Sequence, residues 1–177
     1  LLISGAVPNY VDAFFETISG FTTTGASVII DVENLPHGIL FWRSLTQWLG
    51  GMGFILLTLA LIPSLKIAGI KLFKAEFPGP TKDKLVPRII QTSRQLYKVY
   101  FIISILALLM LKTTGLSWFD SFIHTFSSVA TGGFSNQNNS IAAYDNLLTE
   151  LTIVFFMFVG GINFALHYQA LKGDFKP

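Results

Sequence analysis

The chain has 177 residues, of which 51% are hydrophobic, 14% aromatic and only 12% charged, and its formal net charge is +2. A soluble domain carries about twice this fraction of charged residues, so the composition indicates a membrane protein. The absence of cysteine excludes a disulfide framework and a thiolate metal site. Because the chain begins inside an apolar stretch, without an initiator methionine or a charged leader, we expect it to be a piece of a longer protein.

The first predicted element is a short apolar helix followed by a return segment. Residues 1–7 are expected to be the end of a truncated helix. Residues 11–21 predict a helix of about 16 Å, which is half the roughly 30 Å depth of the bilayer core. The segment 22–27 that follows is rich in small and hydroxylated residues, and non-helical backbone at membrane depth must be buried in protein or line a wet cavity. The range 11–30 is therefore predicted to be a pore loop.

The next apolar segment, 38–63, is long enough to span the membrane. A predicted linker, 64–94, follows it and is rich in basic residues, which continue to Lys98. These residues are Lys66, Lys71, Lys74, Lys82, Lys84, Arg88, Arg94 and Lys98. Basic residues collect in cytoplasmic loops, so we expect a cytoplasmic linker and a pore loop that enters from the outside. This bias already explains the lysines without nucleic acid, and anionic lipid or a cytosolic partner is the better expectation for their contacts.

A second unit repeats the first. It consists of a helix over 95–113, a pore loop over 117–140 and a helix over 146–170, so that 1–63 and 95–177 form two repeats. Residues 119–135 overlay 11–27 at a constant offset of 108 residues. The matched pairs are Asp12 and Asp120, Phe14 and Phe122, Thr17 and Thr125, Ser19 and Ser127, Thr23 and Thr131, Gly25 and Gly133, and Ser27 and Ser135. The sequence thus predicts an all-α membrane protein built from helix, pore-loop, helix units.

The matched turns carry the chemistry of a cation filter. A cation that leaves water must exchange its hydration shell for oxygens, and rings of backbone carbonyls from four loops supply them in known channels. Directing successive carbonyls at one axis requires positive φ, which Gly25 and Gly133 adopt at little steric cost. Thr23 and Thr131 add hydroxyl oxygens. The candidate metal-ion ligands are Thr22, Thr23, Thr24, Gly25, Ala130, Thr131, Gly132 and Gly133. A single Thr-x-Gly more often serves helix packing, but its recurrence in a longer repeat favours a filter.

Other polar residues do not predict an enzyme. The three histidines, His37, His124 and His167, do not share the spacing of metal ligands, and no pattern of nucleophile and base is present. Asp12 and Asp120 are expected to be helix caps or first-turn partners of the helix dipole.

Arg43, near the outer end of its helix, is expected to pair with an acidic group behind a filter or to snorkel. The pair Gly50-Gly51 overlays Gly160-Gly161 at an offset of 110 residues, and we expect close helix packing more than a bend. Asn163 is expected to face the cavity or a helix neighbour.

Four motifs together resemble the Trk/Ktr/HKT superfamily of potassium transporters, and the second and third resemble the Trk pore-forming branch most. The motifs are Ser19 to Val28 (SGFTTTGASV), Gln47 to Gly53 (QWLGGMG), Ala75 to Pro80 (AEFPGP) and Ala130 to Ser135 (ATGGFS). The resemblance implies four units around a pseudo-fourfold ion pore, with one key glycine in each filter, here Gly25 and Gly133. It also implies a homodimer and a cytosolic regulatory subunit that binds nucleotides. This chain would be the N-terminal half of the core, with repeats three and four outside it.

The expected function is therefore potassium uptake across the bacterial inner membrane, with K⁺ as the transported ion and no covalent cofactor. A glycine at each filter position favours potassium, and a single glycine in each filter favours one dominant ion site. Two alternatives remain open at this point. The chain could be a sodium-permeable relative, or it could be a non-conducting membrane anchor or assembly subunit whose glycine-rich segments only pack.

Overall fold

The computed structural model describes residues 1–53 and 85–172. This part of the chain is helical and without strands, as predicted. Its elements are α1 (Tyr10–Phe21), a helix over residues 37–53, α3 (Leu85–Thr113), α4 (Trp118–Val129), the 3-10 helix η2 (Ser140–Tyr144), α5 (Leu147–Gly161) and α6 (Phe164–Lys172). The expected helix beyond residue 53 and residues 64–84 of the expected linker lie outside the described residues.

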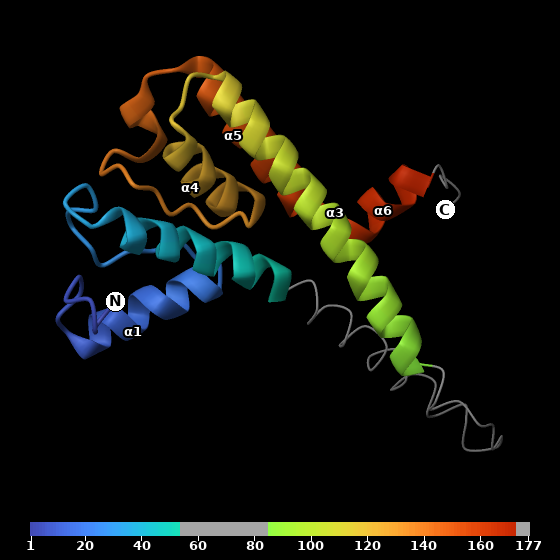
Figure 1. The fold of residues 1–177 in the computed structure, drawn as a ribbon, viewed down its shortest axis with the longest axis horizontal. Helices are drawn as coiled ribbons and strands as arrows, with labels where there is room; N and C mark the ends of the chain where they lie inside the picture. The colour runs from blue at the N-terminus through green and yellow to red at the C-terminus, as the bar shows by residue number, and fades with distance from the viewer. Residues whose placement is uncertain (54–84, 173–177) are drawn as a thin grey trace.

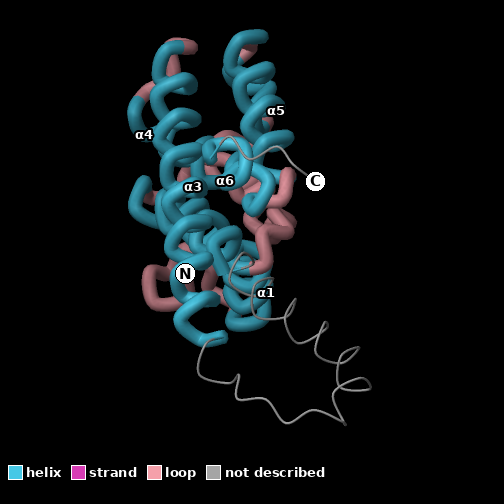
Figure 2. Tube along the Cα trace, turned by 90° about the vertical axis from the view of Figure 1, so that its right-hand side faces the viewer, coloured by secondary structure: helices cyan, strands magenta, loops and turns pink. Residues whose placement is uncertain are grey.

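The helices form two neighbouring groups (Figure 1). The short helix α1 and the 37–53 helix lie beside each other in one group, and α4 packs against both α3 and α5 in the other. The C-terminal half of the long helix α3 lies beside α5. After the chain turns, α6 packs on α3. Loops gather between the helices at the level of α1 and α6 (Figure 2). The two short helices α1 and α4 are thus held by longer helices on their flanks.

The main core cluster lies where α3, α4 and α5 meet. It contains Leu96, Val99, Tyr100, Ile103, Ala107, Val129 and Phe156. Two hydrogen bonds join this cluster to the 37–53 helix: the Tyr100 hydroxyl donates to the Trp48 carbonyl at 3.1 Å, and the Trp48 indole donates to the Ser104 hydroxyl at 2.9 Å. Buried tryptophan and tyrosine need such partners for their polar atoms. The two repeats are therefore joined through side chains as well as through the linker.

Around the apolar core, the packed helices expose large apolar side chains and bury small polar ones. Large apolar side chains are exposed along α3 and α5, among them Phe101, Ile105 and Phe155. In contrast, α4 buries Ser121, His124, Thr125, Ser127 and Ser128. A soluble protein rarely exposes a continuous apolar surface of this extent. Within the described residues, Ser93–Thr113 is the one helix long and apolar enough to cross a membrane, and Leu147–Gly161 is a shorter apolar helix.

Three element bounds differ from the predicted ones. Residues 1–8 form turns and not the end of a helix. The helix α3 begins at Leu85, inside the range predicted as linker, because Pro87 lies in its first turn, where a missing N–H costs no hydrogen bond. The predicted helix 146–170 is interrupted between α5 and α6, where Ile162 is extended (φ −77°, ψ 144°). Adjacent glycines favour a break there, and His167 Nε2 lies 2.9 Å from the Val159 carbonyl oxygen at the end of α5.

Candidate ion-filter site

The two short helices before the turns are copies of each other in structure. Both α1 and α4 have 12 residues, and their first residues, Tyr10 and Trp118, keep the offset of the sequence repeat. The side chain of Asn9 caps α1 and the side chain of Ser117 caps α4. Asp12 and Asp120 lie in the first turns, where a carboxylate interacts favourably with the helix dipole. Of the two roles predicted for these aspartates, first-turn partner is the one observed.

The chain leaves α1 through a Schellman turn. The amide of Thr24 donates to the Ser19 carbonyl at 3.0 Å, and the amide of Thr23 donates to the Gly20 carbonyl at 3.0 Å. These are the two bonds of the Schellman motif, which requires a left-handed residue at the position after the cap. Thr23 occupies that position with φ 56°. The amides of residues 22–25, the first candidate filter segment, therefore donate to the last carbonyl oxygens of α1.

The chain leaves α4 through the same turn. The amide of Gly132 donates to the Ser127 carbonyl at 2.7 Å, and the amide of Thr131 donates to the Ser128 carbonyl at 3.0 Å. Thr131 has φ 55°. In the part of the chain that the structure describes, no donor is bonded to the carbonyl oxygens of residues 22–25 or 130–133. The amides of residues 22–25 and 130–132 are thus bonded to the preceding helices, and the carbonyl oxygens of both segments are left without a described donor.

A threonine at the left-handed position of both turns was not foreseen from the sequence. Glycine is the usual residue there, and a β-branched residue with positive φ is an outlier. The left-handed conformation costs about 1–2 kcal/mol for a residue with a side chain. Thr23 and Thr131 are held in it nevertheless, and neither hydroxyl has a hydrogen-bond partner among the described residues. Strain kept at two equivalent positions is typical of a functional site.

The two predicted glycines also have left-handed backbone. Gly25 has φ 76° and Gly133 has φ 94°. A Cβ on Gly25 would overlap the carbonyl oxygen of Gly132, so the two filter segments are in direct contact. A Cβ on Gly133 would meet no described atom within 4 Å. The first segment therefore packs against the second at Gly25, while no described atom packs against the second segment at Gly133.

The other predicted ligands differ in their surroundings. The Thr22 hydroxyl donates to the Ile18 carbonyl at 2.8 Å, so it faces its own helix, and it accepts from the Thr24 hydroxyl at 2.8 Å. Ala130 and Gly132 are buried, whereas Thr131 and Gly133 are exposed. The structure thus brings together Gly25 and Gly132 of the two segments.

A buried ion pair stands behind the first filter. Arg43 donates from Nε and a terminal nitrogen to one carboxylate oxygen of Glu16, at 2.9 and 2.6 Å, and both side chains are buried. The second carboxylate oxygen accepts from the Val28 amide at 3.0 Å. Arg43 also donates to the Ser27 hydroxyl at 3.1 Å and to the Ser135 carbonyl at 3.4 Å. Of the two roles expected for Arg43, pairing with an acidic group is the observed one, and it fastens the exits of both filter segments.

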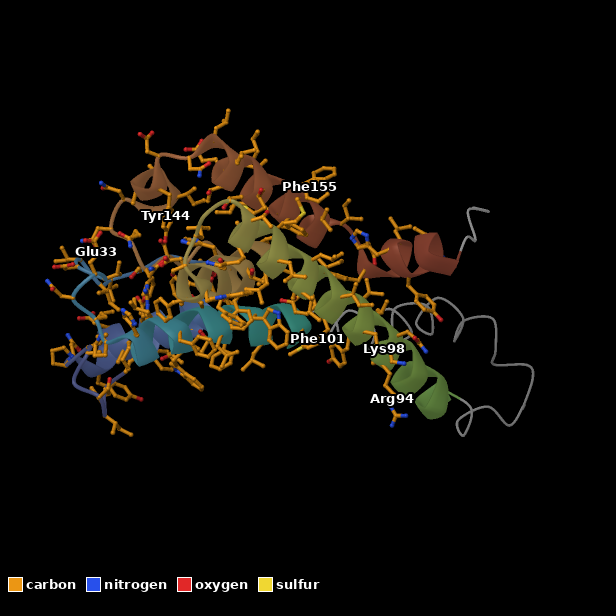
Figure 3. The ribbon with its side chains drawn as sticks, turned by 45° about the horizontal axis from the view of Figure 1, so that its top comes forward. Glu33, Arg94, Lys98, Phe101, Tyr144 and Phe155 are labelled. Carbon is orange, nitrogen blue, oxygen red and sulfur yellow. The ribbon has the colours of Figure 1, made fainter. Side chains whose placement is uncertain are left out.

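The second repeat has a chain of hydrogen bonds in the same place instead of an ion pair. His124 occupies the position that Glu16 has in the first repeat, and its Nε2 lies 3.0 Å from the Tyr144 hydroxyl. That hydroxyl donates to Asn136 at 3.2 Å, so it accepts from the histidine, and Asn136 donates to Asp120 at 2.6 Å. Figure 3 labels Tyr144, which reaches this chain from η2. The role of His124 is therefore structural.

Gln47 supports the second filter from the 37–53 helix. Its side chain is fully buried, and its Oε1 accepts from the Phe134 amide at 3.1 Å. A Cβ on Gly132 would overlap the Gln47 amide, so glycine is required for this close approach. The Nε2 atom of Gln47 is buried without a partner among the described residues. The sequence signal that could have indicated this role is an uncharged polar residue inside an apolar span.

Hydrogen bonds join the loops that follow the two candidate filter segments. The side chain of Asn138 accepts from the Val32 amide at 2.8 Å and donates to the Asp31 carboxylate at 3.0 Å. The backbone N–H of Asn138 donates to the Glu33 carboxylate at 3.0 Å. The hydrogen bond from Asn138 is the main reason why the pKa of the Asp31 carboxyl lies below its usual value. Glu33 is labelled at the loop end of the molecule in Figure 3. The junction between the two loops thus carries two carboxylates, Asp31 and Glu33.

The matched glycines of the later helices pack against the ends of α1 and α4. A Cβ on Gly50 would overlap the Phe21 carbonyl oxygen, and a Cβ on Gly160 would overlap the Val129 carbonyl oxygen. Phe21 and Val129 are the last residues of the two short helices. The expectation of close packing is confirmed for the first glycine of each pair, and the second pair also stands at a helix break.

Replacing Gly160 with alanine is expected to destabilise the protein by about 1–3 kcal/mol, the usual cost of overpacking. The reason is that the new methyl group would overlap backbone atoms of Val129, which cannot rotate away. Thermal unfolding in detergent measures this effect. Gly161→Ala is the matched control, because its Cβ meets no described atom within 4 Å. Equal losses in both variants would contradict the packing role.

These features define the class of protein to which the chain belongs: an all-helical membrane protein, with apolar side chains exposed along its helices and two matched turns after short helices. More particularly, the chain belongs to the TrkH family of cation transport proteins, whose family profile matches residues 1–173.

Relatives and a solved structure agree with this assignment. The Trk system potassium uptake protein TrkH of Salmonella typhimurium is 42% identical over 163 residues, which cover 92% of this chain and 34% of that protein. The TrkG protein of Escherichia coli is 43% identical over 170 residues, 95% of this chain and 35% of that protein. The crystal structure of the potassium transporter TrkH from Vibrio parahaemolyticus superposes with a TM-score of 0.79 at 36% identity, covering 93% of this chain and 32% of that one. The chain spans about a third of the length of these relatives.

Proposed function

We propose that this chain supplies two of four filter segments of a potassium uptake protein in the bacterial inner membrane. The ligands of K⁺ are drawn from residues 22–25 and 130–133, with backbone carbonyl oxygens as the main donors and the Thr23 and Thr131 hydroxyls as additional ones. Trk relatives named for potassium uptake support the choice of ion. The exposed apolar faces of α3 and α5 support a chain that crosses the membrane more than once.

The observation that carries this proposal is the state of the carbonyl groups in the two turns. The amides of residues 22–25 and 130–132 bond back to the preceding helices, and no described donor is bonded to the carbonyl oxygens of either segment. The C-terminal ends of α1 and α4, where helix dipoles are negative, immediately precede these carbonyls. Oxygens and negative dipole ends at one place stabilise a cation without a buried carboxylate.

Two segments cannot enclose an ion from four sides, so we propose that repeats three and four complete the pore. The contact of Gly25 with the Gly132 carbonyl, and the open side of Gly133, support an arrangement in which each filter packs against the next. The resemblance to the Trk branch supports two partners as well, a second copy in a homodimer and a cytosolic nucleotide-binding regulatory subunit. The ion itself requires no covalent cofactor.

The alternatives predict different behaviour in one experiment. The complete gene is expressed in a strain that lacks potassium uptake, and growth is followed at limiting potassium. The proposal predicts restored growth. A sodium-permeable relative would restore growth that added sodium suppresses, and a non-conducting anchor or assembly subunit would restore no growth. Expression at the membrane without growth at any potassium concentration would contradict the proposal.

Replacing Thr131 with glycine separates stability from ion binding. We expect unfolding to require about 1 kcal/mol more, because the left-handed strain of a β-branched residue is removed, while the preference for potassium over sodium falls with the lost hydroxyl. Thermal unfolding and rubidium uptake measure the two effects. Thr131→Ser, which keeps the hydroxyl, is the matched control for selectivity. A glycine variant that is both more stable and equally selective would show that the hydroxyl has no role at the ion.

A further inference from the structure

An apolar groove lies outside the filter, between the end of the described part of the 37–53 helix and the N-terminal half of α3. Its volume is about 840 Å³, which is in the range of pockets that bind small organic ligands. Apolar and aromatic side chains, with one glycine, form most of its walls. The 37–53 helix contributes Leu49, Met52 and Gly53, and α3 contributes Tyr97, Phe101 and Ile102.

Two cations line the same groove. Arg94 and Lys98 are four residues apart on α3 and therefore lie on one face of the helix. Figure 3 labels both, with Phe101 further along the same helix. Both side chains are exposed, and the structure gives neither an acidic partner among the described residues. The groove thus combines an apolar wall with an uncompensated positive charge.

The depth of these cations along the helix matches a lipid headgroup. The apolar stretch Ser93–Thr113 has 21 residues, which is about 31 Å at 1.5 Å per residue and equals the thickness of the bilayer core. At its other end, Lys112 lies over the ring of Trp118 at 5.4 Å, as expected for residues at a membrane boundary. Arg94 is therefore at the opposite boundary, with Lys98 one turn inside it.

We propose that this groove binds an anionic phospholipid of the cytoplasmic leaflet, with its phosphate at Arg94 and Lys98 and an acyl chain along the apolar wall. A phospholipid offers both the anion and the apolar chain that the groove requires, whereas a free phosphate or an acidic peptide would leave the apolar wall uncovered. Basic pockets between helices on the cytoplasmic side recognise anionic headgroups. This inference rests on the membrane orientation of the proposed function and not on which ion is carried.

Native mass spectrometry of the delipidated protein from the complete gene tests the headgroup part. The protein is titrated with phosphatidylglycerol and, separately, with phosphatidylcholine. We expect Arg94→Gln with Lys98→Gln to weaken phosphatidylglycerol binding roughly thirty-fold, since each juxtamembrane cation contributes about a factor of five. Phosphatidylcholine binding should change little. The reversed pair, Arg94→Lys with Lys98→Arg, keeps the charge and is expected to bind as the unaltered protein does.

A second pair of variants tests the apolar wall with the cations left in place. Gly53→Phe adds a ring at the wall of the groove, because Gly53 lines the groove and a Cβ there meets no described atom within 4 Å. Gly38→Phe is the matched control: it lies on the same helix with equally open surroundings, away from the groove. We expect Gly53→Phe to reduce the binding of phosphatidylglycerol at least tenfold and Gly38→Phe to leave it unchanged.

Unchanged phosphatidylglycerol binding in both the Arg94/Lys98 and the Gly53 variants would overturn the proposal. It would mean that another part of the protein or a cytosolic partner covers this groove. An equal loss for both lipids would overturn the role of the cations. These outcomes are independent of ion transport, since the unaltered protein can fail to restore potassium-limited growth and still bind the lipid through these residues.

Discussion

Replacing Gly25 with alanine is expected to reduce the preference for potassium over sodium at least tenfold. The Cβ of alanine would overlap the Gly132 carbonyl oxygen, so the two filter segments must separate. The backbone at φ 76° adds strain, because a residue with a side chain costs about 1–2 kcal/mol in this region, roughly a five- to thirty-fold change in an equilibrium. The effect is large because both costs fall on the atoms proposed to hold the ion.

The measurement is rubidium uptake into vesicles that contain the protein from the complete gene, with sodium as competitor. Gly5→Ala is the matched control, because Gly5 also has left-handed backbone, at φ 72°, but no described atom within 4 Å of its Cβ. The Gly5→Ala variant has the same backbone strain without a clash, and it lies outside the filter segments, so its potassium preference should not change. An unchanged preference for potassium over sodium in the Gly25→Ala variant would show that this glycine has no role in selectivity.

Replacing Arg43 with glutamine is expected to have the largest effect on stability, a loss of about 3–5 kcal/mol. Glu16 would remain buried without its partner, and removing one member of a buried ion pair leaves an uncompensated charge. The Ser27 hydroxyl and the Ser135 carbonyl would lose their donor at the same time. Both filter exits should therefore loosen, and thermal unfolding and ion preference should change together.

A double variant distinguishes the charge from the packing. Glu16→Gln together with Arg43→Met removes both charges and should recover much of the lost stability, as replacement of buried pairs by apolar residues often does. The exposed Asp145→Asn variant is the control for removing a carboxylate outside the ion pair, and it should leave unfolding nearly unchanged. If Arg43→Gln unfolds at the temperature of the unaltered protein, the pair has no role in holding the filter.

The sequence allowed the local part of the site to be predicted. The constant offset between the two copies located α1 and α4, because the same spacing of apolar residues produces the same half-helix twice. The left-handed backbone at Gly25 and Gly133 was predictable since glycine adopts it at little cost. The break after Gly161 was less so, because a glycine pair permits either a bend or close packing and the structure uses it for both.

The rest of the site depends on tertiary contacts. Left-handed threonines contradict local preference, so only the surrounding fold could place Thr23 and Thr131 there. The pairing of Arg43 with Glu16 joins positions 27 residues apart, and the support of the second filter by Gln47 joins positions 87 apart. A single sequence does not specify which of its buried polar groups meet. These partners meet because the 37–53 helix packs between α1 and the segment after α4, which brings Arg43 to Glu16 and Gln47 to Phe134.

The proposed potassium ligands are the carbonyl oxygens of these two turns. Anomalous scattering from thallium, a heavy substitute for potassium, in crystals of the protein from the complete gene tests this assignment most directly. We expect a peak in contact with the carbonyl oxygens of the segments 22–25 and 130–133, and weaker occupancy in the Gly25→Ala variant. Thallium bound elsewhere in the pore, with no peak beside either segment, would contradict the assignment.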